Sequence, residues 1–479
     1  MHTKNKKVLD VTKLIEDPRM GARRWGLVVL CLIVVIFDGF DAQVIGYAAP
    51  ALIRSWHVGR DVLGPVISAG LFGLMLGALV LGTLGDRIGR KSIILISVTV
   101  FGIGSLLTVF AENAQQMMIL RFLTGIGLGG AMPGAIALVS EYVPTRLRVS
   151  LVTITVCGFA IGPALGGFVA GPLINLYGWP SLFVLGSVLP LLLLPVLWRM
   201  LPESSRFLIA RGDSPEKITR NLQRLFPEHR LSADEEYGQP EGRVPRASVR
   251  EVFAEGRGLG TVLLWSAIFF NLIGINLQTS WLPTMISELG YPIEQAVTAT
   301  AMLHVGGALG GLVLSRLLDR VDPLRAVAVI GMISGLFVIL IGFSGGSLMM
   351  LRFSIFFAGL FVVGGQSALN AMSGMFYPSH IRSTGAGWAL GIGRLGAAAG
   401  PIVGSALAAL HMDIRMLYYV EAVPFFLMGA AVFGIGLTRR RGLRSQAVDT
   451  EEVGSALPMT AMGGFAGRPD AGSAAEEQR

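Results

Sequence analysis

Charged residues are scarce in this sequence. Asp, Glu, Lys and Arg make up 15% of its 479 residues, whereas a soluble protein carries about 25%. Polar interruptions are also scarce, since runs of about 20 apolar residues recur along most of the chain without alternating apolar and polar positions. The low charge excludes an ordinary soluble protein, and the missing alternation excludes a membrane β-barrel. The composition therefore predicts an all-α protein that crosses a membrane many times.

Cysteine is nearly absent as well. Cys31 and Cys157 both lie inside apolar runs, and we interpret them as small apolar fillers rather than a disulfide or metal site. The sequence offers no nucleophile–base set, metal-ligand spacing or phosphate-binding loop, so we expect no enzyme, no metal and no cofactor. The net charge of +8 falls in loops and tails, so nucleic acid is not an expected partner. We expect the polar first residues to be a cytosolic tail, not a cleaved signal peptide.

Twelve spans are predicted in two groups of six. They cover residues 25–48, 62–84, 92–111, 116–139, 149–172, 180–200, 259–283, 295–316, 324–343, 347–371, 383–409 and 414–437. The expected organisation is an N-terminal tail (1–24), a six-helix bundle (25–200), a cytoplasmic central loop (201–258), a second six-helix bundle (259–437) and a disordered cytoplasmic tail (438–479).

Basic residues divide the predicted loops into two sets. One set holds most of the Lys and Arg residues, among them Arg23, Arg24, Arg87, Arg90, Lys91, Arg146, Arg148, Arg316, Arg320, Arg382 and the cluster that begins at Arg439. The other set holds Arg54, Arg60, Arg415, Glu112, Glu288 and Glu294. Because basic loops stay in the cytoplasm, we expect both termini and the central loop there.

The two predicted halves repeat each other at offsets of about 231–238 residues. The matches are Phe37-Asp38 with Phe270-Asn271, Pro50 with Pro283, Asp86-Arg87 with Asp319-Arg320, Leu120-Arg121-Phe122 with Leu351-Arg352-Phe353, Pro144 with Pro378, and Gly162-Pro163 with Gly400-Pro401. Duplicated six-helix halves around a cytoplasmic loop are typical of secondary transporters, whose site lies between the halves near the midplane.

Two carboxylates lie in the middle of the first span. Asp38 and Asp41 are three residues apart and share one helix face. Asp38 follows the start of the span by about 13 residues, so it lies ~20 Å deep. Each carboxylate costs roughly 2.5–3.5 kcal/mol there, and two neighbours in a low dielectric do not both ionise easily. We expect them to couple proton movement or to gate the substrate. A purely structural salt bridge is the alternative, and which aspartate holds the proton stays open.

Three motifs carry a resemblance to a known family. Residues 85–91 read Gly-Asp-Arg-Ile-Gly-Arg-Lys after the second span, residues 121–125 read Arg-Phe-Leu-Thr-Gly in the fourth, and residues 202–207 read Pro-Glu-Ser-Ser-Arg-Phe after the sixth. Over about residues 20–440 the sequence resembles the major facilitator superfamily. The resemblance implies a twelve-helix transporter built as two six-helix pseudo-repeat bundles.

A further pairing of motifs narrows this resemblance. Residues 38–41 (Asp-Gly-Phe-Asp), together with residues 377–385 (Tyr-Pro-Ser-His-Ile-Arg-Ser-Thr-Gly), are similar to the aromatic acid:proton symporter family. That family imports benzoate-type and hydroxybenzoate-type anions with protons and requires both first-span carboxylates. The resemblance implies a small aromatic carboxylate as the substrate and the proton gradient as the energy source. No motif separates one aromatic acid from another.

Arg394 is the candidate for binding the substrate carboxylate. It lies about 11 residues into its span, and a buried guanidinium can hold a carboxylate through two hydrogen bonds. A pairing with Asp38 or Asp41 in the empty site is the alternative, and the two roles are compatible. Arg121, near the outer end of its span, is interpreted as a structural or relay charge.

Other candidates for contacting the ring lie in the same spans. His304 can hydrogen-bond a phenolic hydroxyl or a carboxylate, or relay a proton, and a packed and satisfied histidine is the alternative. We expect polar contacts from Asn271 and Gln278, and stacking from Phe40 and Trp281. Simple helix packing is the alternative for these aromatic residues.

A charged cluster after the second span is expected to control conformation. Asp86, Arg87 and Arg90 can latch the cytoplasmic ends of the two halves together in the outward-open state and release them as the halves rock. A solvated anchor is the alternative. The other residues assigned to this gating set are Arg121, Glu141, Arg148 and Arg382.

Residues 158–167 form a small-residue face that allows close helix packing. They also resemble a fifth-span motif of proton-coupled drug antiporters, so export of a drug or an organic acid is the first alternative to import. A chemotaxis receptor for aromatic acids is the second, although the central loop and tail hold no signalling domain. We expect a monomer in the lipid bilayer. The ring substituents, the proton stoichiometry and the regulation stay open.

Overall fold

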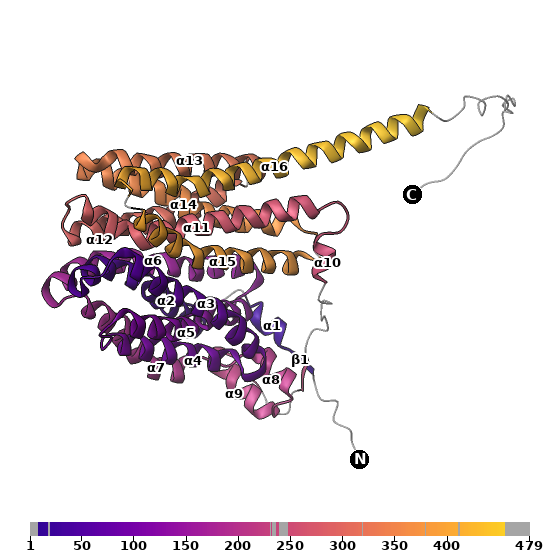
Figure 1. Ribbon diagram of the computed structural model, residues 1–479. Coiled ribbons are helices and arrows are strands. Elements are labelled where there is room, and N and C mark those ends of the chain that lie inside the picture. Colours follow the sequence, from indigo (N-terminus) through magenta and orange to yellow (C-terminus); the bar gives the residue numbers. More distant parts are fainter. Residues whose placement is uncertain are drawn as a thin grey trace, which may run out of the picture. The chain divides into compact units, whose positions relative to one another are not determined.

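The protein, seen here as a computed structural model, is almost entirely helical (Figure 1). The structure describes residues 8–17, 20–229, 231, 236–238, 248–318, 320–378, 380–410 and 412–455. Within these ranges, twelve helices are long and apolar enough to cross a membrane. The predicted all-α membrane fold is therefore confirmed, and each of the twelve predicted spans overlaps one of these helices.

The first six long helices form the N-terminal half. They are α2 (Ala22–Trp56), α3 (Arg60–Ile88), α4 (Arg90–Thr108), α5 (Ala114–Tyr142), α6 (Thr145–Tyr177) and α7 (Pro180–Met200). Turn-forming residues separate them, since Gly89 adopts a φ of 100° after α3 and Gly178 a φ of 76° after α6. Asn113 caps α5, because its side chain accepts a hydrogen bond from the backbone nitrogen of Gln116 at 2.9 Å.

The second half repeats this arrangement. It contains α11 (Gly258–Glu288), α12 (Ile293–Leu318), α13 (Pro323–Phe343), the short turn η1 (Ser344–Gly346), α14 (Leu348–Phe376), α15 (Arg382–Ala409) and α16 (Ile414–Ser455). Helix pairing follows the same plan in both halves: α3 packs on α5 and α2 on α6, as α12 packs on α14 and α11 on α15. This correspondence agrees with the duplication predicted from the sequence.

The two halves meet along three helix pairs, which are α2 with α11, α3 with α15 and α6 with α12 (Figure 1). Within the N-terminal half, α2 and α6 approach very closely. A Cβ on Gly162 would lie 2.0 Å from the carbonyl oxygen of Ile36, and one on Gly39 would lie 2.2 Å from that of Phe159. The small-residue face predicted in α6 is thus used for close packing against α2.

Short elements lie before the first half and between the two halves. They are β1 (Val8–Asp10), α1 (Val11–Ile15), α8 (Ser205–Arg211), α9 (Pro215–Leu225), β2 (Glu236–Gly238) and α10 (Val249–Val252). Strand β1 pairs in parallel with β2. Val11 and Ile15 are buried in the same apolar cluster as Leu222 and Leu225 of α9. The predicted N-terminal tail therefore contains a segment that packs against the rest of the N-terminal half.

The prediction of a disordered tail from residue 438 onward is wrong for its first part. Helix α16 continues to Ser455, while residues 456–479 lie outside the described residues. No proline interrupts the sequence between Thr438 and Ser455, and four Arg and two Glu residues lie there. These residues favour the helix, so the hydrogen-bond ladder of the last span can continue outward. The part of α16 beyond Ile435 belongs to a separate unit of the chain.

Candidate functional site

A cavity of about 280 Å³ lies between the two halves. We call the end of the bundle where α3 begins the Arg60 end, and the end where α3 gives way to α4 the Arg90 end. Helices α2, α3, α5 and α6 supply one wall, which is apolar except for Gln43. Helices α11, α12 and α14 supply the other. The cavity opens toward the Arg90 end, where Ser367 and Asn370 of α14 are exposed.

The wall from the C-terminal half carries a chain of amides. Asn271 Nδ2 donates a hydrogen bond to Gln366 Oε1 at 2.8 Å, and Gln366 Nε2 donates to Asn370 Oδ1 at 2.8 Å. Gln366 and Asn370 line the cavity together with Asn276 and Thr279. Asn271 is fully buried behind them, so its contribution is to orient Gln366 rather than to line the cavity itself.

His304 and Gln278 are buried side chains with unused hydrogen-bonding atoms. His304 lines the cavity, and its Nε2 has no hydrogen-bond partner within the described residues. Neither amide atom of Gln278 has a partner there, but Gln278 does not line the cavity. A buried polar group without a partner costs about 1–3 kcal/mol. Of the two, His304 is therefore the one placed to gain a hydrogen bond from a ligand in the cavity.

The Asp41 carboxylate is held in a buried polar cluster. Its Oδ2 lies 3.3 Å from Arg121 Nη1, and its Oδ1 accepts a hydrogen bond from Ser105 Oγ at 2.5 Å. Arg121 also donates to the hydroxyls of Thr108 and Thr124, at 2.8 and 3.2 Å. Helices α2, α4 and α5 thus meet at one ion pair, which joins a predicted proton-coupling residue to the predicted relay charge.

A second, much smaller cavity adjoins this ion pair. Its volume of about 20 Å³ is enough for one water molecule, and both Asp41 and Arg121 line it. Ala42 and Leu71 line this cavity as well as the large one. The two cavities therefore adjoin at these two side chains.

Asp38 has a different environment from Asp41. It is buried, and its Oδ1 has no hydrogen-bond partner among the described residues. The charges of Asp41 and of Arg394 act on Asp38, although no ion pair within the described residues joins it to either. Arg394 of α15 is half-buried and does not line the cavity. The structure thus brings Arg394 near Asp38, as one of the two sequence-based interpretations expected.

Phe40 and Trp281 lie outside the cavity and inside the apolar core. The Phe40 ring packs against Gly166 and Gly186. Trp281 Nε1 donates a hydrogen bond to the backbone oxygen of Pro401 at 3.1 Å, and this bond joins α11 to α15. For both residues the structure favours the packing interpretation over stacking on a ligand.

Polar contacts between the halves gather toward the Arg60 end. Arg60 of α3 forms an ion pair with Glu288 of α11, and Arg54 Nη2 donates to Ser287 Oγ at 2.8 Å. Similar contacts join Asn175 to Glu294 (3.0 Å) and Gln43 to the backbone oxygen of Thr279 (2.7 Å). These bonds close the cavity on the side opposite to its opening.

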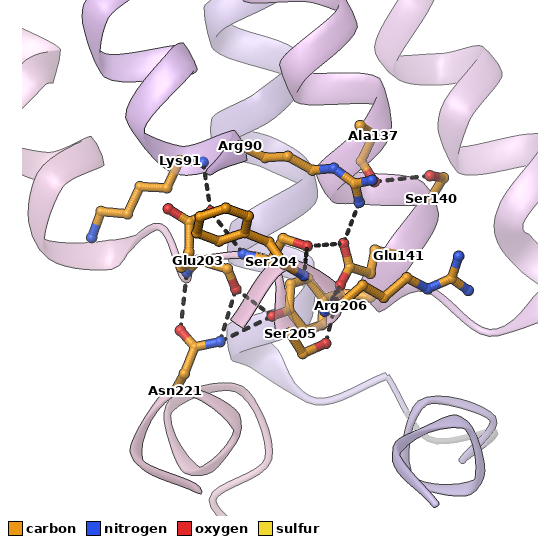
Figure 2. Close-up of polar contacts among 12 residues, drawn as sticks. Arg90, Lys91, Ala137, Ser140, Glu141, Glu203, Ser204, Ser205, Arg206 and Asn221 are labelled. Atoms are coloured by element: carbon orange, nitrogen blue, oxygen red, sulfur yellow. Dashed lines mark hydrogen bonds and ion pairs between the residues drawn. The ribbon is translucent and has the colours of Figure 1, made fainter. Parts of the chain in front are cut away.

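At the Arg90 end, Glu141 organises a cluster within the N-terminal half (Figure 2). Its buried carboxylate forms an ion pair with Arg90 and accepts hydrogen bonds from Ser204 Oγ at 2.6 Å and Ser205 Oγ at 3.1 Å. It also accepts one from the backbone nitrogen of Arg206 at 2.7 Å, at the start of α8. A carboxylate at this position satisfies free N–H groups of the helix and opposes its dipole.

The remaining predicted gating residues lie apart from one another. Asp86 and Arg87 are exposed, and neither forms an ion pair within the described ranges. Arg148 Nη2 lies 3.9 Å from Glu16, and Arg382 Nε donates to a backbone oxygen of its own half. Within the described residues none of these contacts joins the two halves, and the latch stays a prediction for the outward-open state.

The comparison with known proteins agrees with this architecture. The model of the Major Facilitator Superfamily matches residues 31–324 and 264–469. The chain belongs to the major facilitator superfamily. This is a family of transporters, and the chain is accordingly a multi-pass membrane transporter and not an enzyme.

Similar proteins align with this superfamily member over most of its length. The 4-hydroxybenzoate transporter PcaK of Pseudomonas putida is 40% identical over 90% of this chain and 96% of its own. The gallate transporter of Pseudomonas putida is 39% identical with the same coverage. A solved structure of a bacterial homologue of the human lysosomal transporter Spinster, in an inward-facing and occupied conformation, covers 87% of this chain and 98% of its own, with 16% identity and a TM-score of 0.70.

Several side chains at the centre of this major facilitator superfamily transporter were missed by the sequence analysis. Ser105, Thr108 and Thr124 surround the ion pair, but small hydroxyl residues in apolar runs are too common to be singled out. Glu421 of α16 is buried, its Oε2 has no hydrogen-bond partner in the described part, and the charge of Arg60 acts on it. A carboxylate inside a predicted span was the signal that could have found Glu421.

Proposed function

We propose that this protein imports an aromatic carboxylate of the benzoate or hydroxybenzoate type together with protons, by alternating access. The buried ion pair of Asp41 and Arg121, next to a cavity between the two halves, is the observation that carries the proposal. The names of the relatives that transport gallate and 4-hydroxybenzoate support the substrate class.

The cavity suits a small ring with polar substituents. Its volume of about 280 Å³ is close to the lower limit of ~300 Å³ for small-molecule sites. The apolar wall packs against the faces of the ring, and Asn276 and Gln366 provide hydrogen bonds to its substituents. We assign a ring hydroxyl to His304, because its Nε2 has no other partner within the described residues.

Asp38 and Arg394 link the proton to the anion in this proposal. The negative charge of Asp38 balances the positive charge of Arg394, although no ion pair within the described residues joins the two side chains. Protonation of Asp38 removes this balance, so the guanidinium becomes free to attract the carboxylate of the substrate. A proton and an anion then occupy the site together, as symport requires.

Asp41 serves as the relay for the proton. Its pair with Arg121 stabilises the charged carboxylate, and the cavity of about 20 Å³ gives room for a water molecule between the pair and the substrate. Ala42 and Leu71 form the boundary that this water would cross. The two aspartates therefore have distinct tasks, since Asp38 responds to the anion and Asp41 passes on the proton.

The orientation of the protein in the membrane follows from the distribution of basic residues. Lys and Arg predominate in the loops of the Arg90 end, so we assign this end and both termini to the cytoplasm, in the bacterial cytoplasmic (inner) membrane. The opening of the cavity toward the Arg90 end is then the inward-open state. The proton gradient supplies the energy without a cofactor, and the protein acts as a monomer.

The test is uptake of labelled 4-hydroxybenzoate into proteoliposomes with an imposed pH gradient, acidic on the outside. Accumulation above the external concentration, abolished by an uncoupler, supports the proposal. Extrusion of preloaded substrate against its gradient under the same conditions would support export by antiport instead, the function that the small-residue face of α6 favours. Competition by benzoates, cinnamates and phenylpropionates then shows which aromatic acids the site accepts.

A further inference from the structure

A third cavity, of about 310 Å³, lies at the Arg90 end and outside the transport path. It is formed where α8 and α9 cover the junction of α3 and α4. Five cationic side chains line it, which are Lys91, Arg211, Lys217, Arg220 and Arg224. Glu203 is the one carboxylate in the same wall.

The positive charges in this cavity are not balanced by the described acidic residues. Lys217 pairs with Asp213 at 3.0 Å, but Arg220 and Arg224 have no acidic partner within the described ranges. The charges of Lys91 and Arg224 repel each other across the cavity.

Glu203 offsets only one of these positive charges, and its charge acts on Lys91. One of its carboxylate oxygens accepts hydrogen bonds from the backbone nitrogens of Lys91 at 3.1 Å and Ser204 at 2.9 Å. This carboxylate therefore serves the N-termini of α4 and α8, and the cavity keeps a surplus of cations that would attract an anion.

The frame of the cavity is held by buried polar contacts. Asn221 of α9 accepts from the backbone nitrogen of Glu203 at 3.0 Å and donates to its backbone oxygen at 2.8 Å and to the Tyr142 hydroxyl at 3.0 Å. Figure 2 shows the bonds between Asn221 and Glu203 beside the cluster of Glu141. On the other face of α9, Ile218 and Leu222 are buried in the apolar cluster of the N-terminal half. The cationic side chains of α9, which are Lys217, Arg220 and Arg224, are thus carried on a helix that is packed in place and not on a loop.

The cavity also lies beside an exposed tryptophan at the end of a predicted span. Trp198, near the end of α7, is 70% exposed, and Lys91 Nζ donates to its backbone oxygen at 2.6 Å. An exposed tryptophan at the end of a spanning helix is typical of the boundary between the acyl chains and the headgroups. A ligand in the cavity can therefore belong to a lipid whose chains lie beside α7.

We propose that this cavity binds a phosphate group presented by the headgroup of an anionic phospholipid such as phosphatidylglycerol. Arginine guanidinium groups bind phosphate oxygens through paired hydrogen bonds, and basic pockets at the membrane surface select anionic lipids. The site is separate from the substrate cavity, and its occupancy does not depend on the proposed transport function.

Native mass spectrometry of the full-length protein tests this proposal, with phosphatidylglycerol and phosphatidylcholine added in equal amounts. We expect preferential retention of phosphatidylglycerol. We expect the double variant Arg220→Gln/Arg224→Gln to weaken it by at least about tenfold. The matched control is Arg250→Gln/Arg325→Gln, which removes two exposed charges elsewhere at the Arg90 end and should retain the lipid. The melting temperature of each variant checks the fold.

Three results would overturn the proposal. The first is equal retention of both lipids, and the second is an equal loss of phosphatidylglycerol in the pocket variant and the control, which would indicate non-specific charge attraction. The third is binding of inorganic phosphate or glycerol phosphate to the native protein, lost in the pocket variant, without retention of phosphatidylglycerol. That result would assign the same phosphate chemistry to a soluble anion. Competition of inorganic phosphate with retained phosphatidylglycerol would support a shared site for the headgroup phosphate.

Discussion

Asp41 of α2 and Arg121 of α5 form an ion pair that is buried from solvent, with 3.3 Å between Oδ2 and Nη1. Three hydroxyl side chains hold this pair, because Ser105 binds the aspartate while Thr108 and Thr124 bind the arginine beside it. Neither charge can be removed without leaving the other in a medium of low dielectric constant. The pair is therefore the part of the molecule most sensitive to a change of charge.

Asp41→Asn should abolish accumulation of substrate against its gradient. The loss of the negative charge leaves Arg121 unpaired, which costs about 3–5 kcal/mol for a buried pair, so the melting temperature should also fall. Uptake into proteoliposomes and a thermal unfolding curve measure the two effects. Ser105→Ala keeps the ion pair and is the control that should still accumulate substrate. Normal accumulation by Asp41→Asn would remove Asp41 from the coupling mechanism.

Arg394→Lys should weaken binding of the aromatic carboxylate about tenfold, or ~1.4 kcal/mol, because lysine lacks the planar pair of donors. Asp38→Asn should bind the anion with an affinity that no longer depends on pH, since it imitates the protonated aspartate. Equilibrium binding of labelled substrate at two pH values measures both. An unchanged affinity in Arg394→Lys would show that this guanidinium does not hold the substrate.

His304→Phe should change the selectivity between ring substituents. The loss of one hydrogen bond is expected to weaken binding of 4-hydroxybenzoate by about 1–2 kcal/mol, and to affect benzoate much less. Competition of each acid with the same labelled substrate gives the ratio. Asn276→Leu, in the same wall, is the comparison for a general loss of polarity. Equal losses for both acids in His304→Phe would contradict contact with the ring hydroxyl.

Arg60→Gln should shift the protein toward opening at the Arg60 end. The ion pair with Glu288 is partly exposed, so its loss is worth about 0.2–1 kcal/mol and should change the population at most about fivefold. Spin labels at Ser55 and Gln295, on opposite halves, report the separation. Glu288→Gln should act in the same direction. Unaltered distance distributions in both variants would mean that the pair does not hold the cavity closed.

Acidification should release the N-terminal segment from α6. Hydrogen bonds from the side chain and backbone of Thr145 hold the pKa of Glu16 below its ordinary value, with a smaller contribution from Arg148. A lowered pKa stabilises the contact at pH values above the ordinary pKa of a glutamate, and this stabilisation is lost as the pH falls through the lowered pKa of the folded protein. Limited proteolysis near Glu16 across this range measures the release. Glu16→Gln should be cleaved equally at all pH values, and an identical pH profile in both proteins would contradict the prediction.

The fold followed from the sequence because a spanning helix needs about 20 apolar residues, and this requirement leaves a periodic record in the chain. The free-energy cost of placing the carboxylates of Asp38 and Asp41 inside a span was equally visible in the sequence. The partner of Asp41 was not, because Arg121 reaches Asp41 only through the packing of α5 on α2, about 80 residues away along the chain. Hydropathy likewise cannot separate an aromatic residue that packs from one that contacts a ligand, and so the sequence left both roles open for Phe40.

Charges at the ends of helices were the other limit of the sequence. Arg60 and Glu288 were seen only as loop charges that indicate orientation, although they form an ion pair between the halves. Such pairs depend on the state of the transporter, since they form at the end that is closed. A linear pattern records which charges are present at each end, but not which of them meet in one state.

The pairing of β1 with β2 has a consequence for the synthesis of the protein. Residues 8–10 leave the ribosome first, but their partner strand, residues 236–238, follows only after all six helices of the N-terminal half have been made. The nascent N-terminus must therefore wait at the membrane surface until the central loop emerges. Pairing of the two strands then joins the start of the N-terminal half to the loop that follows it, so this half is fixed at both ends only after its sixth helix has been made.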